Sequence, residues 1–175
     1  MSPSSPFVIT PFNPTTDLPA TTALFRAYAA SLDLDLSFQN FEMEISALPG
    51  AYTPPGGALL LARHPNPNPD SNSNLTSGAN PPIGCIALRS LPPDPNTCEL
   101  KRLYTHPTAR GHGLGRLLTT RMIALARDLG YKTMRLDTLP TMTAARALYD
   151  SLGFVEIDAY YPTPVRGTVF LELRL

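Results

Sequence analysis

Apolar and polar residues follow two distinct periods along the chain, which together predict a mixed α/β protein. Apolar residues recur every three or four positions, the period of an amphipathic helix, over residues 17–32, 38–50, 114–129 and 141–154. Short apolar stretches bounded by proline, glycine or polar residues predict strands over 6–12, 56–63, 82–90, 97–107, 132–138, 154–160 and 167–175. The predicted order is one strand, two helices, three strands, and then helix, strand, helix and two strands.

The helix predicted after Gly113 has the most regular pattern. Its apolar residues follow one another at spacings of four, four, three and four: Leu114, Leu118, Met122, Leu125 and Leu129. Gly130 comes next and is expected to end the helix, since glycine readily adopts the left-handed backbone found there. Nearer the start of the chain, Asp17 is predicted to cap the first helix.

A stretch of proline, asparagine and serine, HPNPNPDSNSNLTSGANPP at residues 64–82, separates two of the predicted strands. This composition has too little apolar surface to build a core of its own. We therefore expect a mobile hairpin loop at 64–82, inside a single domain that spans residues 1–175 and is long enough for one buried core.

Composition and charge exclude several classes of protein. The formal net charge is zero, so the chain lacks the positive charge that nucleic-acid binding requires, and no nucleic acid is expected as a partner. No apolar run is long enough to cross a bilayer and no export signal is visible, which favours a cytoplasmic protein without a membrane partner. Cys85 and Cys98 are then expected to be reduced core residues.

Charge is nevertheless uneven along the chain. Eight Lys or Arg and one acid, Asp128, lie between Lys101 and Arg135, whereas the segment 17–44 has five acids and one base, Arg26. A basic segment suits an anionic ligand and an acidic segment a cationic one, and a solvated surface is the simpler alternative for each. No His, Cys, Asp or Glu cluster has metal-ligand spacing, so no metal is expected.

The segment ARGHGLG, residues 109–115, joins a predicted strand to the most regular helix. Glycine lets a backbone approach a ligand closely, and the first turn of a helix presents unpaired N–H groups at its positive end. Arg110 and Arg116 add positive charge. The segment is therefore suited to a phosphate or pyrophosphate, although a glycine turn that merely begins a helix has the same composition.

ARGHGLGRLL resembles motif A of the GNAT superfamily of acyl-CoA N-acyltransferases, whose loop reads Arg/Gln-x-x-Gly-x-Gly/Ala, with Arg110, Gly113 and Gly115 at the fixed positions. The segment that ends in ALYDSLGF resembles motif B through Ala145, Leu148, Tyr149, Gly153 and Phe154. The predicted order of elements is similar to that of the family from end to end. The resemblance implies an α/β fold with a mixed, mostly antiparallel sheet of about seven strands, a central parallel pair that splays apart, and helices on both faces.

The resemblance also implies acetyl-CoA as the cofactor. In the family, backbone N–H groups of the loop hold the CoA pyrophosphate, and the end of the preceding strand pairs with the pantetheine arm like an added strand. Carried over, the cofactor-binding residues are Leu103, Tyr104, Thr105, Arg110, Gly111, His112, Gly113, Leu114, Gly115 and Arg116. One position departs from the family pattern, because Met142 stands where an asparagine often contacts the pantetheine.

Two catalytic residues follow from the same resemblance, each with an alternative. Tyr149 matches the tyrosine that protonates the leaving thiolate in many members, and otherwise it is a core residue of its helix. Glu99 lies eleven residues before Arg110, the offset of the catalytic carboxylate in the family's histone acetyltransferases. Glu99 is a candidate general base for the amine, and otherwise it pairs with Lys101 or Arg102 on the sheet while water takes the proton.

The amine acceptor is not fixed by the sequence. In this fold the acceptor enters over the first two helices and the last two strands, where the candidate contacts are Asp33, Asp35, Tyr160, Tyr161 and Arg166. The resemblance implies a small-molecule amine N-acetyltransferase that acts as a monomer or homodimer. Two alternatives stay open: an acetyltransferase of protein or peptide N-termini, and a non-catalytic module that binds acyl-CoA.

Overall fold

A seven-stranded sheet in the order β1-β2-β3-β4-β5-β7-β6 forms the centre of the protein. The computed structural model describes residues 6–65 and 80–175. The strands are β1 (Val8–Pro11), β2 (Ala58–Arg63), β3 (Gly84–Ser90), β4 (Thr97–Thr105), β5 (Thr133–Thr138), β6 (Val155–Ile157) and β7 (Val169–Arg174). All neighbouring strands are antiparallel except β4 and β5, so the predicted fold class is confirmed.

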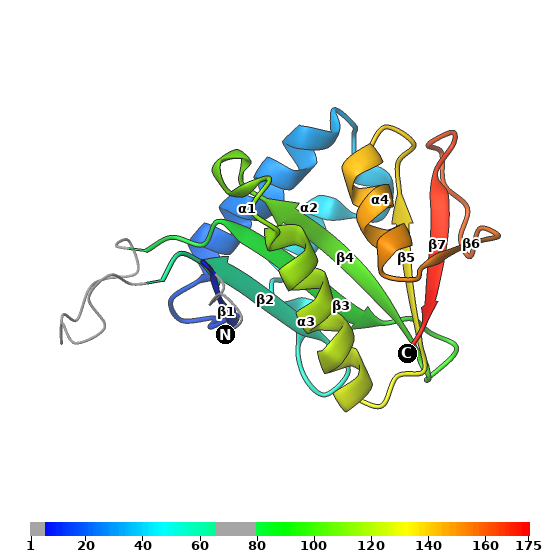
Figure 1. Cartoon of the computed structure of the whole chain (residues 1–175), viewed down its shortest axis with the longest axis horizontal. Helices are drawn as coiled ribbons and strands as arrows, with labels where there is room; N and C mark the ends of the chain where they lie inside the picture. Colours follow the sequence, from blue (N-terminus) through cyan, green and yellow to red (C-terminus); the bar gives the residue numbers. More distant parts are fainter. Residues whose placement is uncertain (1–5, 66–79) are drawn as a thin grey trace.

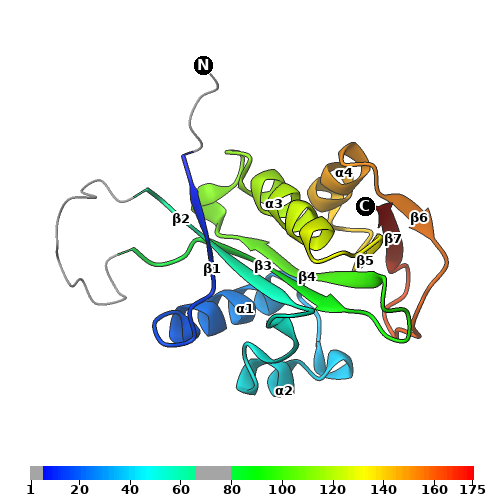
Figure 2. The same ribbon diagram turned by 90° about the horizontal axis from the view of Figure 1, so that it is seen from below.

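Helices cover both faces of this sheet (Figures 1 and 2). On one face lie α1 (Leu18–Leu32) and α2 (Phe41–Ser46), and on the other lie α3 (Leu114–Asp128) and α4 (Thr143–Ser151). Three short 3₁₀ turns, η1 (Ser37–Gln39), η2 (Gly50–Tyr52) and η3 (Pro107–Ala109), lie in the connections. The second predicted helix, 38–50, is therefore shorter than expected and is flanked by two such turns.

Each helical layer buries its own apolar core against the sheet. The regular stripe of α3 gives one core through Leu114, Leu118 and Met122, which are all at most 1% exposed. The opposite core forms around Phe25 of α1 and the two buried residues of α2, Phe41 and Ile45. Gly130 has φ of 89° after the end of α3, as its predicted role requires.

The parallel strands β4 and β5 separate after a short paired region. Thr97, Cys98 and Glu99 pair with Thr133–Arg135, and no further pairs join these two strands. β4 continues to Thr105 along β3 alone, which leaves one edge of its second half without a strand beside it. Figure 1 shows the two strands diverging toward α1 and α4. This is the splayed pair that the family resemblance implies.

A β-bulge lies in this free half of β4. Cys85 pairs with Tyr104 and Ala87 with Lys101, so β4 holds one residue more than β3 between the two pairs. Arg102, inside the bulge, has φ of 57°, which is rare for a residue with a side chain. Because the bulge interrupts the alternation of the strand, Lys101 and Arg102 both line the same cavity.

Asp17 does not cap α1, contrary to the expectation. It occupies the N-cap position without a side-chain cap bond, because its carboxylate accepts hydrogen bonds from the Asn13 backbone N–H at 2.9 Å and from Arg63 at 2.7 Å. The ion pair ties the start of α1 to the end of β2. The hairpin loop expected at 64–82 falls mainly on residues outside the described ranges, and its mobility stays a prediction.

Cys85 and Cys98 are buried and unbridged, as predicted, and burial raises the pKa of each thiol to about 12. At pH 8 the native protein is therefore expected to react with a disulfide reagent far more slowly than the denatured protein, because the thiolate is the reacting species. Release of the coloured thiolate from the reagent, with and without denaturant, measures the difference. Equal rates in the two states would contradict the burial of these thiols.

Candidate active site

The loop between β4 and α3 keeps its backbone open to solvent. Gly111 and Gly113 have φ of 78° and 77°, a left-handed conformation in which residues with side chains are strained. A Cβ atom built on either glycine would meet nothing within 4 Å. Gly113 is the N-cap of α3, so the N–H groups of the first helical turn, which have no partner within the helix, begin directly after this open loop.

A groove of about 590 Å³ runs from this loop along the end of β4 to the start of α4. All the predicted cofactor residues line it except His112. The His112 ring lies 2.9 Å from the Arg110 carbonyl oxygen and is exposed. Arg110 and Arg116 supply the positive charge, and Arg116 is held by a 2.6 Å hydrogen bond to the Ser151 hydroxyl.

A second, smaller cavity adjoins the groove where β4 and β5 separate. It is bounded by the α1–α2 region, β4, β5 and the connection between β6 and β7. Four residues line both spaces, so the groove and the cavity lie side by side and meet at Tyr28, Leu32, Leu103 and Met142. Met142, the position that departs from the family motif, therefore lies at the junction, where its sulfur is 3.7 Å from the Thr138 hydroxyl.

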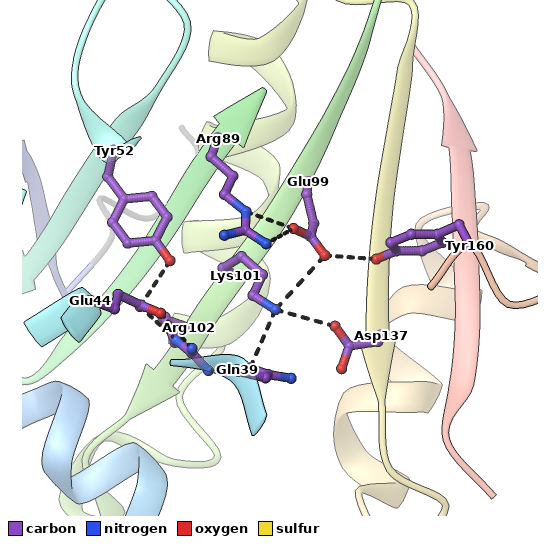
Figure 3. Close-up of polar contacts among 9 residues, drawn as sticks. All are labelled: Gln39, Glu44, Tyr52, Arg89, Glu99, Lys101, Arg102, Asp137 and Tyr160. Atoms are coloured by element: carbon purple, nitrogen blue, oxygen red, sulfur yellow. Dashed lines mark hydrogen bonds and ion pairs between the residues drawn. The ribbon is translucent and has the colours of Figure 1, made fainter. Parts of the chain in front are cut away.

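Beside this cavity lies a polar cluster that consists of Gln39, Glu44, Tyr52, Arg89, Glu99, Lys101, Arg102, Asp137 and Tyr160 (Figure 3). Its most buried acid is Glu99, which is 1% exposed. One Glu99 oxygen accepts hydrogen bonds from Arg89 at 2.6 and 2.7 Å, and the other accepts one from the Tyr160 hydroxyl at 2.9 Å. The structure thus shows Glu99 paired across the sheet, with Arg89 as its main partner.

Arg102 forms the other closed ion pair of the polar cluster. Its guanidinium donates to the two Glu44 oxygens at 2.8 and 2.6 Å and to Gln39 at 3.0 Å. Glu44 also accepts a hydrogen bond from the Tyr52 hydroxyl at 2.9 Å, and the guanidinium lowers the pKa of Glu44 although burial opposes this. These contacts fix α2 and η1 against β4.

Lys101 and Asp137 are held far more loosely. The Lys101 ammonium is 3.5 Å from Asp137, 3.5 Å from Gln39 and 3.8 Å from Glu99, all longer than the 2.7–2.9 Å usual for a charged hydrogen bond. Lys101 is 7% exposed and the Asp137 side chain 17% exposed, and both line the cavity. Lys101 and Asp137 therefore form the ion pair of the polar cluster in which both side chains line the cavity.

Tyr149 lines the same cavity from α4. Its ring packs on Phe154 with centroids 5.5 Å apart, and the residue is 5% exposed. Burial raises the pKa of the phenol, and the nearby Asp137 carboxylate raises it further. The hydroxyl is therefore protonated at neutral pH.

A family model described as "Acetyltransferase (GNAT) family" matches residues 41–154. The chain belongs to the GNAT acetyltransferase family. An uncharacterized N-acetyltransferase of Schizosaccharomyces pombe is 35% identical over 159 residues, which cover 91% of this chain and 89% of the relative. An acetyltransferase structure from Streptococcus agalactiae has a TM-score of 0.70 at 24% identity, over 97% of this chain and 99% of that one.

A further GNAT-like structure carries a ligand. The structure of yncA, a putative acetyltransferase from Salmonella typhimurium, was solved with its cofactor acetyl-CoA. It has a TM-score of 0.61 at 22% identity and covers 97% of this chain and 94% of that one. At this identity the likeness shows a shared fold.

The GNAT fold of this chain distributes the five predicted acceptor residues over three places. Asp33 and Asp35 are exposed and line another depression beside α1, which shares Leu34 and Leu36 with the cavity, and Asp35 accepts hydrogen bonds from Ser37. Arg166 is exposed in the connection between β6 and β7. The rings of Tyr160 and Tyr161 stack edge-to-face on each other and on Phe170, and the Tyr160 hydroxyl is engaged by Glu99.

Other residues of this GNAT site were not singled out from the sequence. Asp137 could have been identified from the sequence, because it is the single acid of its strand and lies shortly before motif B. The roles of Arg89 and Gln39 arise from contacts across 10 and 63 residues of chain, which no local pattern reveals.

The remaining histidines and acids form no further centre in the described ranges. His106 is exposed and its ring lies 2.8 Å from the Thr108 hydroxyl, within the turn that leads to the glycine loop. Among residues 6–65 and 80–175, no three His, Cys, Asp or Glu side chains are placed to share a metal ion. In the same ranges no helix has the length and apolar character needed to cross a bilayer.

Proposed function

We propose that this GNAT protein transfers the acetyl group of acetyl-CoA to a primary amine of a small molecule, by direct attack in a ternary complex. The proposal rests on the position of the loop groove beside the cavity, with Leu103 and Met142 lining both and Tyr149 in the wall of the cavity. A cofactor lying in the groove would present its thioester at that junction, and an amine in the cavity would meet it there.

The groove supports acetyl-CoA as the cofactor. Its positive side chains and the N–H groups at the start of α3 suit a pyrophosphate, and the free edge of β4 suits an extended pantetheine arm. The acetyl-CoA in the related Salmonella structure supports the same assignment. The backbone N–H near Leu103, in the irregular part of β4, would then stabilise the negative charge on the thioester oxygen.

The transfer requires three proton movements. The ammonium of the acceptor loses one proton to water before its nitrogen attacks the thioester carbon. The carbon–sulfur bond then breaks, the thiolate takes the proton of the Tyr149 hydroxyl, and the tyrosinate takes the second proton from the nitrogen. The products are the N-acetylated amine, CoA thiol and one released proton. Glu99 is not given a direct role in this scheme, because it is buried, does not line the cavity and already accepts hydrogen bonds from Arg89 and Tyr160.

Substitution of Tyr149 by phenylalanine tests this function. We expect kcat to fall about 100-fold, the lower end of the usual contribution of general acid catalysis, because the thiolate loses its proton donor while the ring still packs on Phe154. The dissociation constant of acetyl-CoA, measured by calorimetry, should stay the same. An unchanged kcat would exclude Tyr149 as the acid, and a large loss of cofactor affinity would assign it a binding role.

A further inference from the structure

We propose that the acceptor is an apolar α-amino acid, whose ammonium group binds Asp137 and whose carboxylate binds Lys101. This inference rests on the proposed function and names the substrate class of the same site. It starts from the contrast between the ion pairs of the polar cluster. The Arg89–Glu99 and Arg102–Glu44 pairs are closed at 2.6 Å, whereas Lys101 and Asp137 stand 3.5 Å apart.

The loose pair is also the one that a ligand can reach. Lys101 and Asp137 line the cavity at the point where β4 and β5 diverge, and Tyr149 lines the same cavity. An ammonium buried to 7% exposure with contacts no shorter than 3.5 Å retains capacity for a stronger acceptor. A carboxylate on the ligand would supply it, and the ligand's own ammonium would compensate Asp137.

The spacing of the two charges selects a compact zwitterion. Because the Lys101 nitrogen and the Asp137 oxygen are 3.5 Å apart, a ligand that pairs with both must carry its charges on adjacent groups, as an α-amino acid does. A polyamine would bring only positive charge to a site that already holds the Lys101 ammonium. A zwitterion adds no net charge to the buried site, which avoids the cost of an uncompensated ion.

The remaining walls indicate the side chain. Around the loose ion pair the cavity is bounded mainly by aliphatic and aromatic residues, among them Leu34, Leu36, Phe38, Leu139 and Val165. The cavity itself measures about 40 Å³, so a whole amino acid enters only when these walls move apart. An amino acid with an aliphatic or thioether side chain satisfies both the charges and these walls.

The first test compares matched acceptors with the unmodified protein. L-leucine, L-leucinamide and isopentylamine share a side chain, and only leucine has the carboxylate. We expect kcat/KM for leucine to exceed that for isopentylamine and leucinamide by about 10-fold or more, the usual effect of one charged hydrogen bond. Equal values, or a preference for isopentylamine, would overturn the proposal while leaving amine acetylation intact. Failure of every amine would instead overturn the proposed function.

The second test removes the cation. In Lys101→Met, the ratio of kcat/KM for leucine to that for isopentylamine should fall about 10-fold toward one. Lys132→Met is the matched control, since Lys132 is exposed at the start of β5 and outside the cavity, and it should leave the ratio unchanged. Calorimetry with acetyl-CoA shows whether each variant is folded. A ratio that Lys101→Met does not change would contradict the role of Lys101.

Discussion

Replacement of Gly113 by glutamate is expected to raise the dissociation constant of acetyl-CoA by about 100-fold. Two effects combine. A residue with a side chain at φ of 77° costs about 1–2 kcal/mol, which pulls the loop away from the geometry that presents its N–H groups. The carboxylate also places negative charge at the positive end of α3, where an anion of the ligand gains up to about 2 kcal/mol. Together they amount to roughly two factors of ten.

The same helix provides a matched control. Gly130, after the far end of α3, has φ of 89° and open space around its Cβ position, so Gly130→Glu adds the same side chain with a similar backbone strain away from the groove. Cofactor affinity should be unchanged in Gly130→Glu and intermediate in Gly113→Ala. Equal losses in Gly113→Glu and Gly130→Glu would show a general loss of stability and would contradict the assignment of the loop.

Substitution of Glu44 by glutamine is expected to lower the free energy of unfolding by about 3–5 kcal/mol, the usual cost of leaving a buried charge without its partner. The Arg102 side chain is 2% exposed, and its two shortest contacts go to Glu44. Glutamine keeps the shape of the side chain but removes the charge that compensates the guanidinium. Urea unfolding measures the difference.

A neighbouring acid, Glu42, shows whether the cost depends on burial or only on the loss of a charge. Glu42 forms an ion pair of similar geometry with Arg26 at 3.0 Å, but its side chain is 72% exposed. Glu42→Gln should therefore change stability far less than Glu44→Gln does. If Glu44→Gln costs no more than Glu42→Gln, the pair does not fix α2 and η1 to β4, and the wall of the cavity must be held in another way.

The elements with strong local signals were predictable from the sequence. The regular apolar stripe and Gly130 defined α3 almost to the residue, because periodicity and end geometry agree there. The Asp17 cap failed because Arg63, 46 residues away, competes for the same carboxylate. The splayed strands came from the family resemblance, since β4 and β5 each have the pattern of an ordinary buried strand.

The candidate site also has one part with a local sequence signal and one part without. The lining of the loop groove was largely predictable because most of it comes from two nearby segments, 103–105 and 109–116, and its role in cofactor binding stays a prediction. The acceptor site was not, because its charges are arranged by contacts between distant strands. The acids of segment 17–44 looked available to a cationic ligand, yet Glu42 and Glu44 are neutralised by Arg26 and Arg102, and Asp137 on β5 faces the cavity instead.

Release of CoA thiol from acetyl-CoA in the presence of a panel of amines is the most direct test that this protein acetylates an amine. The panel should contain amino acids, polyamines, arylamines, aminoglycosides and short peptides, with mass spectrometry of each product. We expect thiol release that depends on the amine, one acetylated amine for each thiol, and the highest kcat/KM with apolar amino acids. Acetyl-CoA that binds by calorimetry but is not consumed with any amine would contradict this expectation and would indicate a binding module.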